Sequence, residues 1–500
     1  MQYQSTRGGQ SGIPSSKAIT KGIAPDGGLF VPESCAKLTL EQITELSNMS
    51  YQELATKILS MFLSDYTIEE LTDCVGKAYN SQKFASTEIT PVHKVNDNTF
   101  VLELWHGPTC AFKDLALQIM PHLLVTACRK NNEDHHIVIL VATSGDTGKA
   151  AMEGFKDVDG VSIIVFFPDQ GVSEVQKLQM VTQEGQNVNA VAVRGNFDDV
   201  QRSLKGIFGD TDIHQKIEEH HMAFSSANSI NWGRLAPQIV YYFRSYAELL
   251  KSNEITLGEK INFAVPSGNF GDILAGYYAI KMGLPVNKLI CASNENNVLT
   301  DFINTGTYDT KRDFIKTNSP SMDIVVSSNL ERLLFELNRG NPERLTDWMQ
   351  KLSTSGAYTV DHATAKAISE IFWAGYSNDQ DVLKTIECMY NEYNYLIDTH
   401  TAVAVDVYDK YLISTSDMTK TVIVATASPF KFNSSVLKAV AGEEAIEGKN
   451  EFELLEMTSK TCGLNIPEGL RNLDKKEIRH KIVCDKSEIG NTVMKLLKIG

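Results

Sequence analysis

The segment IVILVATSGDTGKAAMEGF, residues 137–155, decides the fold class of this chain. Residues 137–143 form an apolar run without polar alternation, which predicts a strand that is buried on both faces. The Gly-rich turn SGDTG follows at once and leads into KAAMEGF, which opens a helix. A buried strand, a tight turn and a helix together form the repeating unit of a parallel sheet that carries helices on both faces.

The same unit recurs along the chain. Short Val- and Ile-rich runs, separated by stretches of helical length, predict buried strands at 162–167, 189–193, 261–265, 289–292 and 421–425, and a helix at 198–208. The sequence therefore predicts an α/β fold of parallel sheets flanked by helices. Such sheets bind ligands at the carboxyl ends of their strands, so the turns that follow the strands are where a site is expected.

A chain of 500 residues is long enough for two or three domains. We expect an N-terminal domain at residues 1–95, an α/β core at 96–440 and a C-terminal segment at 441–500 that packs on the core. Within the core, a smaller lobe that can move is expected at about residues 130–210. Helices are predicted in the flanking regions at 51–63, 68–78, 443–458 and 475–497.

Composition narrows the classes of function. The chain is 42% hydrophobic and 22% charged, with a net charge of −15. This charge argues against nucleic acid or an anionic membrane as the main partner. The eight cysteines form no CxxC pair and are expected to be reduced. No apolar run approaches the ~20 residues of a membrane helix, and no secretory signal is visible. We expect a soluble cytoplasmic protein without a metal site, and no feature indicates an oligomeric state.

Two strands end in Gly-rich turns that lead straight into helices, at residues 142–151 and 265–279. Bare backbone N–H groups at a helix N-terminus can bind phosphate or carboxylate without net positive charge, although glycine here could merely permit a tight turn. Neither turn fits a nucleotide motif. A Walker A loop needs glycine where Thr143 stands and Ser or Thr where Ala150 stands, and GNFGD lacks the GxGxxG spacing.

The segment HGPTCAFKDLALQ, residues 106–118, places Lys113 in the first turn of a predicted helix. A lysine used for Schiff-base chemistry must be neutral part of the time, and burial favours the neutral form. Composition alone also allows a surface lysine whose stem lies along an amphipathic helix.

The motifs, taken together, resemble those of the threonine synthases, which are fold-type-II pyridoxal-phosphate enzymes. The resemblance covers nearly the whole chain. It rests on YQSTRGG (3–9), PDGGLFVP (25–32), HGPTCAFKD (106–114), ATSGDTG (142–148), SSANSINWGRLAPQIVYY (225–242), PSGNFGD (266–272), SPSMDIVVSSNLERLLFEL (319–337), DTHTAVAV (398–405) and ATASPFKF (425–432). One departure is Ser428, where some members carry histidine, so its role is open.

The resemblance implies an architecture like that of the tryptophan synthase β subunit and a pyridoxal 5′-phosphate cofactor carried by Lys113. It assigns the cofactor phosphate to Gly268, Asn269, Phe270 and Gly271, with Asp272 capping and orienting the loop. It also implies that the Thr426 hydroxyl forms a hydrogen bond with the pyridine nitrogen of the cofactor. A hydroxyl, unlike a carboxylate, does not keep that nitrogen protonated, which makes the ring a gentler electron sink.

The implied reaction is the last step of threonine biosynthesis, a lyase reaction that converts O-phospho-L-homoserine and water into L-threonine and phosphate. The resemblance places the substrate carboxylate at Ser144, Gly145, Asp146 and Thr147. Four basic side chains could bind the substrate phosphate or form structural ion pairs: Arg234, Lys431, Lys149 and Arg7. Asn228 and Asn231 either line the site or cap a helix.

Two alternatives remain at the level of sequence. A related phospho-lyase would use the same cofactor and release a 2-oxo acid. A non-catalytic descendant would act as a binding protein, although the joint presence of Lys113, GNFGD and Thr426 argues against it.

Overall fold

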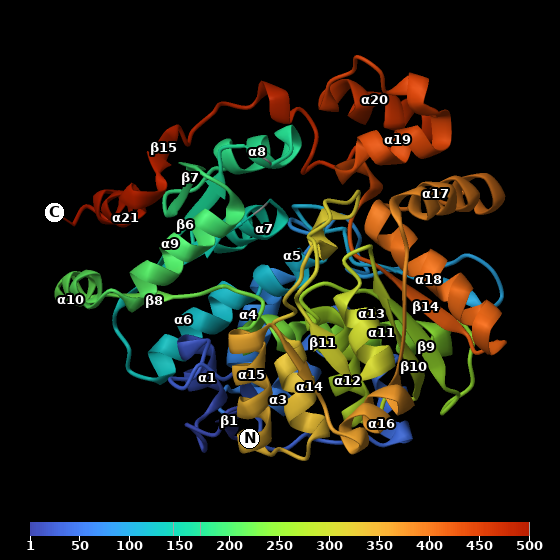
Figure 1. The fold of residues 1–500 in the computed structure, drawn as a ribbon, viewed down its shortest axis with the longest axis horizontal. Helices are drawn as coiled ribbons and strands as arrows, with labels where there is room; N and C mark the ends of the chain where they lie inside the picture. Colours follow the sequence, from blue (N-terminus) through green and yellow to red (C-terminus); the bar gives the residue numbers. More distant parts are fainter. Residues whose placement is uncertain (144, 171, 500) are drawn as a thin grey trace.

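The computed structural model describes residues 1–143, 145–170 and 172–499 and shows two large sheets, each covered by helices (Figure 1). The larger sheet has six strands in the order β13-β10-β9-β14-β4-β3, and only β3 runs antiparallel to its neighbour. Its strands are β3 (Val92–Lys94), β4 (Thr99–Glu103), β9 (Ile261–Pro266), β10 (Val286–Ser293), β13 (Phe372–Tyr376) and β14 (Thr421–Ala425).

The smaller sheet has five strands in the order β15-β7-β6-β5-β8, all parallel. Its strands are β5 (His136–Ala142), β6 (Val161–Pro168), β7 (Val188–Arg194), β8 (Met222–Ser225) and β15 (Ile482–Asp485). Two antiparallel pairs complete the strands: β1 (Tyr3–Ser5) with β2 (Phe30–Pro32), and β11 (Thr307–Asp309) with β12 (Ala357–Thr359). The predicted α/β class and every strand predicted in it are confirmed.

Helices fill the connections between strands. They are α1 (Ser15–Lys21), α2 (Leu40–Leu46), α3 (Tyr51–Phe62), α4 (Ile68–Ala78), α5 (Lys113–Leu117), α6 (Met120–Lys130), α7 (Asp146–Phe155), α8 (Glu174–Val181), α9 (Phe197–Gly209), α10 (Thr211–Glu219), α11 (Trp232–Lys251), α12 (Gly271–Lys281), α13 (Val298–Thr305), α14 (Leu330–Leu337), α15 (Pro342–Ser355), α16 (His362–Ile371), α17 (Asp379–Tyr393), α18 (Thr399–Thr415), α19 (Asn433–Ala441), α20 (Glu451–Cys462) and α21 (Ile489–Leu496). Short 3-10 turns are η1 (Pro320–Met322), η2 (Pro429–Lys431), η3 (Glu443–Ala445), η4 (Leu473–Lys475) and η5 (Lys486–Glu488).

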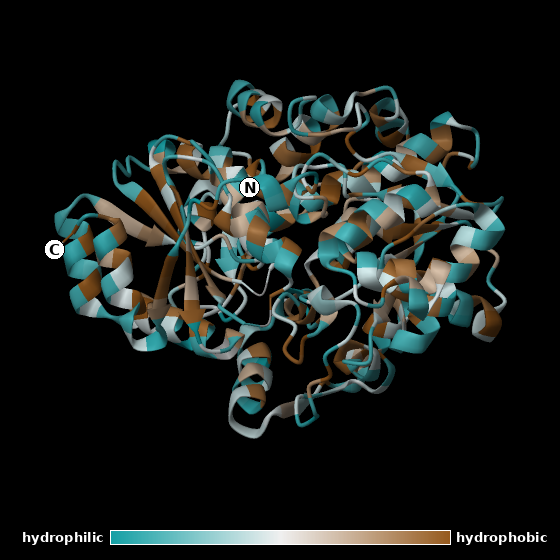
Figure 2. Cartoon of the chain, turned by 90° about the horizontal axis from the view of Figure 1, so that it is seen from above, coloured by the Kyte–Doolittle hydropathy of each residue, from teal (hydrophilic) through white to brown (hydrophobic). Residues whose placement is uncertain are grey.

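Both sheets are buried on two faces, as their apolar strands require. One face of each sheet belongs to a single core shared with the N-terminal helices. The opposite face of the larger sheet packs against α17 and α18, and that of the smaller sheet against α9 and α21. Figure 2 shows the strands as apolar bands inside a more hydrophilic shell of helices. Within the described residues, no helix is long and apolar enough to cross a membrane.

The C-terminal segment differs from its prediction. A helix was expected over 475–497, but residues 482–485 form β15, which pairs in parallel with β7, and only α21 beyond it is α-helical. The run IVCD favours a strand, and pairing satisfies the backbone of β7, which would otherwise be the edge of its sheet. In Figure 1 this red segment lies beside β7.

The lobe expected at about residues 130–210 has a sheet of its own, since β5–β8 fall within residues 136–225. Its mobility and the division into three domains stay predictions. The lobe touches the rest of the chain closely where α7 crosses α5. Gly154 makes this crossing possible, because a Cβ there would lie 2.0 Å from the carbonyl oxygen of Leu117.

We expect Gly154→Ala to lower the free energy of unfolding by about 1–3 kcal/mol, because a methyl group would force α7 away from α5. Gly76→Ala in α4 is the matched control. Nothing lies within 4 Å of its Cβ position, so alanine should raise helix stability by about 0.5–1 kcal/mol. Urea unfolding of both variants measures the difference. Equal stability of the two variants would show that the α5–α7 contact is not tight.

Candidate active site

Lys113 is the first residue of α5, and the loop before it is held at two points. The backbone N–H of Phe112 donates to the carbonyl of Thr426 at 2.8 Å, directly after β14 ends. Asp114 accepts from the backbone N–H and the hydroxyl of Thr109, at 2.8 and 2.7 Å. The lysine therefore lies at the carboxyl end of the larger sheet, where α/β sheets bind ligands.

The amine of Lys113 is buried among charges of both signs. Burial lowers the pKa of Lys113 from its ordinary 10.5 to about 8, while the Asp146 carboxylate, 3.8 Å from Nζ, raises it and the cations Lys431 and Arg234 lower it further. Nζ also donates to the hydroxyl of Ser321 at 3.3 Å. An amine with this pKa is partly neutral at neutral pH, as Schiff-base chemistry requires.

Asp146, the first residue of α7, links the smaller lobe to the rest of the site. Its Oδ1 lies 2.7 Å from the Lys431 ammonium and accepts from Nε2 of Gln176 at 2.9 Å. Burial alone would raise the pKa of Asp146, but the Lys431 and Lys113 ammonium groups outweigh it and hold this pKa well below its usual range. Gly145 leaves room for Gln176, since a Cβ there would lie 2.5 Å from the Gln176 side chain.

The turn between β9 and α12 presents bare backbone at the start of a helix. Phe270 takes the left-handed conformation, with φ 62°, and α12 begins at Gly271. Gly268 packs against the carbonyl of Ser321, because a Cβ on Gly268 would lie 2.9 Å from that oxygen. The carbonyl of Asn269 accepts from the backbone N–H of Asn329 at 3.1 Å, which fixes the turn. The first-turn N–H groups of a helix have no intrahelical acceptor, so this turn can bind an anion.

Asp272 does not cap the helix as expected. Its Oδ1 accepts from the hydroxyls of Tyr241 and Tyr242, at 2.6 and 2.8 Å, and α12 has no side-chain cap. The reason is that α11 packs against α12 and brings two phenols to the carboxylate. Burial raises the pKa of Asp272 to about 6, although both phenols oppose the rise. Oδ2 is buried and has no partner within the described residues.

The four basic side chains differ in what they contact. Three have an acidic partner: Lys431 with Asp146, Lys149 with Glu153, and Arg7 with Glu331. Arg234, on α11, has none within the described residues. It is 4% exposed, its Nη1 donates to the carbonyl of Ala227 at 2.9 Å, and its Nε is buried without an acceptor. A buried guanidinium without an acid is a candidate anion site.

The remaining residues predicted for the site differ in their positions and contacts. Ser144 lies outside the described residues. Thr147 is half-buried on α7, and Asn228 is exposed in the loop before α11. Asn231 caps α11 by accepting from the backbone N–H of Gly233, which favours the capping alternative. The hydroxyl of Ser428 caps η2.

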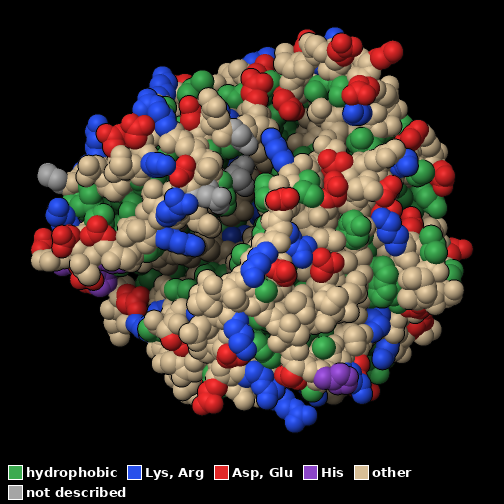
Figure 3. Space-filling model, in the orientation of Figure 1, with side chains coloured by type: hydrophobic (Ala, Val, Ile, Leu, Met, Phe, Trp, Pro, Cys, Tyr) green, Lys and Arg blue, Asp and Glu red, His purple; other side chains and the backbone are tan. Residues whose placement is uncertain are grey.

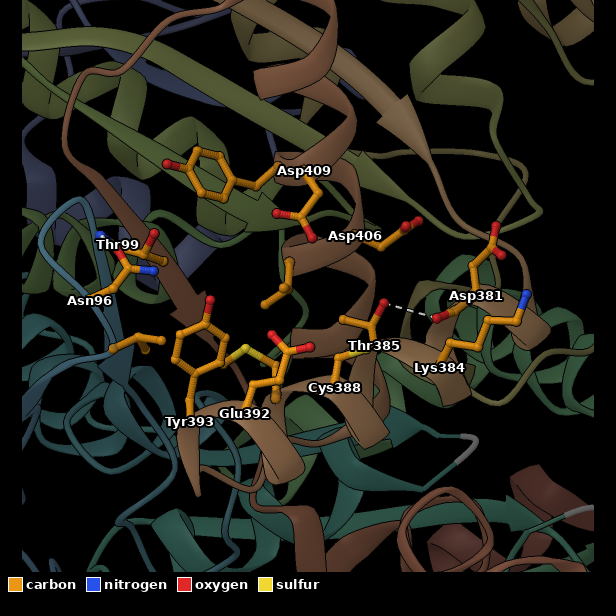
Figure 4. A pocket seen from close by; sticks show the side chains of 14 residues that line it. Asn96, Thr99, Asp381, Lys384, Thr385, Cys388, Glu392, Tyr393, Asp406 and Asp409 are labelled. Carbon is orange, nitrogen blue, oxygen red and sulfur yellow. Dashed lines mark hydrogen bonds between the residues drawn. The ribbon is translucent and has the colours of Figure 1, made fainter.

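Figure 3 shows the surface hollowed between the smaller lobe and the rest of the molecule, with Lys and Arg side chains at the edge. A separate hollow of about 300 Å³ lies on the outside of α17 and α18 (Figure 4). Its lining mixes apolar side chains with four carboxylates, and burial, together with the carboxylates of Asp406 and Glu392, raises the pKa of Asp409 to about 6. None of its lining residues belongs to the predicted site, so we place the chemistry at Lys113.

Sequence reasoning missed Ser321, Gln176 and His400 as residues around the site. Ser321 and His400 stand in motifs that carried the resemblance, yet nothing in their residue types indicated that Ser321 would meet Lys113. Gln176 stands outside every motif, and only its hydrogen bond to Asp146 and its packing against Gly145 reveal it. These contacts join residues that are far apart in the chain.

The residues present fit pyridoxal phosphate. Lys113 supplies a buried amine of lowered pKa, the 268–271 turn supplies backbone donors at a helix start, and Thr426 lies within the same site. The side chain of Thr426 is buried, and no described residue forms a hydrogen bond with its hydroxyl. An amine, an anion-binding turn and a free hydroxyl match the aldehyde, the phosphate and the ring nitrogen of this cofactor.

Comparison with family models divides the chain into three matched regions. Residues 2–79 match the model "Threonine synthase N terminus", residues 84–427 match "Pyridoxal-phosphate dependent enzyme", and residues 401–489 match "Threonine synthase, C-terminal". The middle model covers more than half of the chain and includes Lys113, the 268–271 turn and Thr426.

Individual proteins agree with the family models. Human threonine synthase-like 1 is 39% identical over 86% of this chain, which spans 58% of that protein's length. Threonine synthase of Schizosaccharomyces pombe is 38% identical over 95% of this chain and 96% of its own length. The PLP-bound threonine synthase of Brucella melitensis, a solved structure, superposes with a TM-score of 0.88 at 36% identity over 99% of both chains. The chain therefore belongs to the threonine synthase family of pyridoxal-phosphate-dependent enzymes.

Proposed function

We propose that this chain is a threonine synthase, which converts O-phospho-L-homoserine and water into L-threonine and phosphate. The observation that carries the proposal is the Lys113 amine, buried at the carboxyl end of the larger sheet with a pKa lowered by that burial to about 8. It lies in a chain that aligns with curated threonine synthases over most of its length. The eight free cysteines favour a reducing compartment, and we propose the cytoplasm.

Pyridoxal phosphate supplies an electron sink for negative charge at the substrate carbons. Lys113 would hold the cofactor covalently, the 268–271 turn would bind its phosphate, and the Thr426 hydroxyl would bind the ring nitrogen. The hydrogen bonds that Asp272 accepts from Tyr241 and Tyr242 would fix the start of α12, which follows directly after that turn. A free amine with a pKa near 8 can both take and return a proton at neutral pH, which fits Lys113 as the acid and base of the reaction.

The substrate brings two anionic groups, and the site has separate features for each. The N-terminal turn of α7 would receive the carboxylate, with Lys431 offsetting the negative charge of Asp146 beside it. Arg234 would bind the phosphate, because its guanidinium is the one among the four candidates without an acid partner in the described chain. The Asp146–Lys431 contact would connect the smaller lobe to the rest of the site, and further closure on substrate would keep bulk water out.

We expect Lys113→Ala to abolish both turnover and the visible absorbance of the bound cofactor, while circular dichroism and elution volume stay unchanged. The assay should use O-phospho-L-homoserine and identify the products. Threonine with phosphate from the wild-type chain supports the proposal, whereas 2-oxobutyrate with phosphate would identify a phospho-lyase. Near-normal turnover in Lys113→Ala would exclude the assignment of the cofactor lysine.

We expect Arg234→Gln to lower kcat/KM by roughly tenfold to a hundredfold, because a charge-assisted hydrogen bond is worth about 1.5–3 kcal/mol. Inhibition by inorganic phosphate should weaken in parallel. Arg7→Gln is the control, since the Arg7 guanidinium already pairs with Glu331 at 2.9 Å. If the two variants lost activity equally, or if phosphate inhibition were unchanged in Arg234→Gln, the phosphate would bind elsewhere.

We expect the smaller lobe to close on substrate rather than on cofactor alone. A phosphonate analogue of the substrate should slow amide hydrogen exchange over residues 140–210 of the holoenzyme, because α7 and α8 then lose access to open states. Exchange should be measured with and without the analogue. Unchanged protection over this range would mean that the lobe is rigid.

A further inference from the structure

Ser321 lies at the point where three parts of the site meet. It stands in η1, within the SPSMD motif, and its hydroxyl accepts from Lys113 Nζ at 3.3 Å. Its carbonyl packs against Gly268 of the anion-binding turn. Its backbone N–H donates to Nε2 of His400 at 3.1 Å. One half-buried serine therefore contacts the reactive amine, the turn and a buried histidine.

His400 is oriented by Asp398. The Oδ2 of Asp398 lies 2.8 Å from Nδ1 of His400, and both side chains are almost fully buried. Asp398 is the N-cap of α18 and also accepts from the backbone N–H groups of His400 and Thr401, so the helix fixes its position. The ring of Phe432 packs against the imidazole, with centroids 4.8 Å apart.

The hydrogen bonds determine the tautomer of His400. A backbone N–H can only donate, so Nε2, which receives the Ser321 N–H, carries no proton. The ring proton is on Nδ1 and is donated to Asp398. His400 cannot act as a general base toward the Ser321 hydroxyl in this arrangement, because its free lone pair is already used. The Asp398–His400 pair holds the serine in place and does not activate it as a nucleophile.

A second set of contacts holds the same segment. Asp323 accepts from Thr317, Asn294 and Asn296, through hydrogen bonds of 2.7 to 3.0 Å. The segment 317–323 is thus fixed on both sides of Ser321. A hydroxyl that met the lysine by chance on a loose surface loop would lack such contacts.

We propose that Ser321 is a catalytic partner of Lys113: its hydroxyl stabilises and orients the free amine, and the Asp398–His400 pair positions the serine. The inference rests on the proposed role of Lys113 as the cofactor lysine. A hydroxyl is suited to this task because it accepts from the ammonium form and donates to the lone pair of the neutral form. It therefore keeps one orientation of Nζ through both protonation states.

The test measures the free amine directly in the full-length chain from which the cofactor has been removed. A short pulse of acetic anhydride across a pH series, with mass spectrometry of the Lys113 peptide, gives the pKa of that amine. Exposed Lys37 serves as the internal reference. Asp146, Asp114, Lys431 and Arg234 face the amine as well and stay unchanged in every variant.

We expect Ser321→Ala to increase the acid dissociation constant of Lys113 about tenfold, because the ammonium loses an acceptor. At pH 9, where the amine is mostly neutral in both chains, the rate of cofactor attachment should fall by a similar factor, because orientation is lost. Ser321→Thr keeps the hydroxyl and should restore both values. Ser319→Ala is the matched control, since that buried hydroxyl belongs to the same segment and contacts Asn294 rather than Lys113.

The His400 variants test the positioning pair. His400→Leu removes the acceptor of the Ser321 N–H, so it should lower the pKa of Lys113 and the rate of cofactor attachment, as Ser321→Ala does. His400→Gln keeps an acceptor and should lower these two values less. If Ser321→Ala matched the wild type in pKa and attachment rate, the proposal would be overturned. An effect of Ser321→Ala without any effect of His400→Leu would overturn the role of the pair. A wild-type chain that attached no cofactor at Lys113 would instead contradict the proposed function, while the labelling would still report on Ser321.

Discussion

The site depends on a lysine that is kept buried beside a carboxylate that it shares with a second lysine. The nearest carboxylate oxygen, on Asp146, is 3.8 Å from Lys113 Nζ and is itself in contact with Lys431. Lowering the pKa of Lys113 from 10.5 to about 8 by burial corresponds to roughly 3 kcal/mol against the charged form. The surrounding fold must offset this cost, and it does so with two sheets and a shared apolar core.

The two sheets bring their strand ends together around that amine. The larger sheet contributes the residues after β14 and β9, which are Thr426 and the 268–271 turn. The smaller sheet contributes the turn after β5, where α7 begins with Asp146. The ion pair between Asp146 and Lys431 joins the two halves directly. The residues proposed to bind the cofactor therefore follow strands of the larger sheet, and the residues proposed to close the site follow a strand of the smaller sheet.

Local signals in the sequence predicted most of the fold and part of the site. Buried parallel strands are continuous apolar runs, so β5, β6, β9 and β14 were found within a residue or two, and the resemblance located Lys113. Long-range contacts could not be predicted, because no local pattern shows that Ser321 meets a lysine 208 residues away or that Asp272 binds two tyrosines rather than a helix end. The strand β15 was missed because a short, exposed edge strand depends on its partner β7 for stability.

The most direct test of the account is the location of the cofactor on the chain. Borohydride reduction of the holo chain fixes pyridoxal phosphate to the lysine that carries it, and peptide mass mapping then identifies that lysine. We expect the added mass on the peptide that contains Lys113 and on no other. Modification of Lys431, Lys149 or any other lysine, or no fixed cofactor at all, would contradict it.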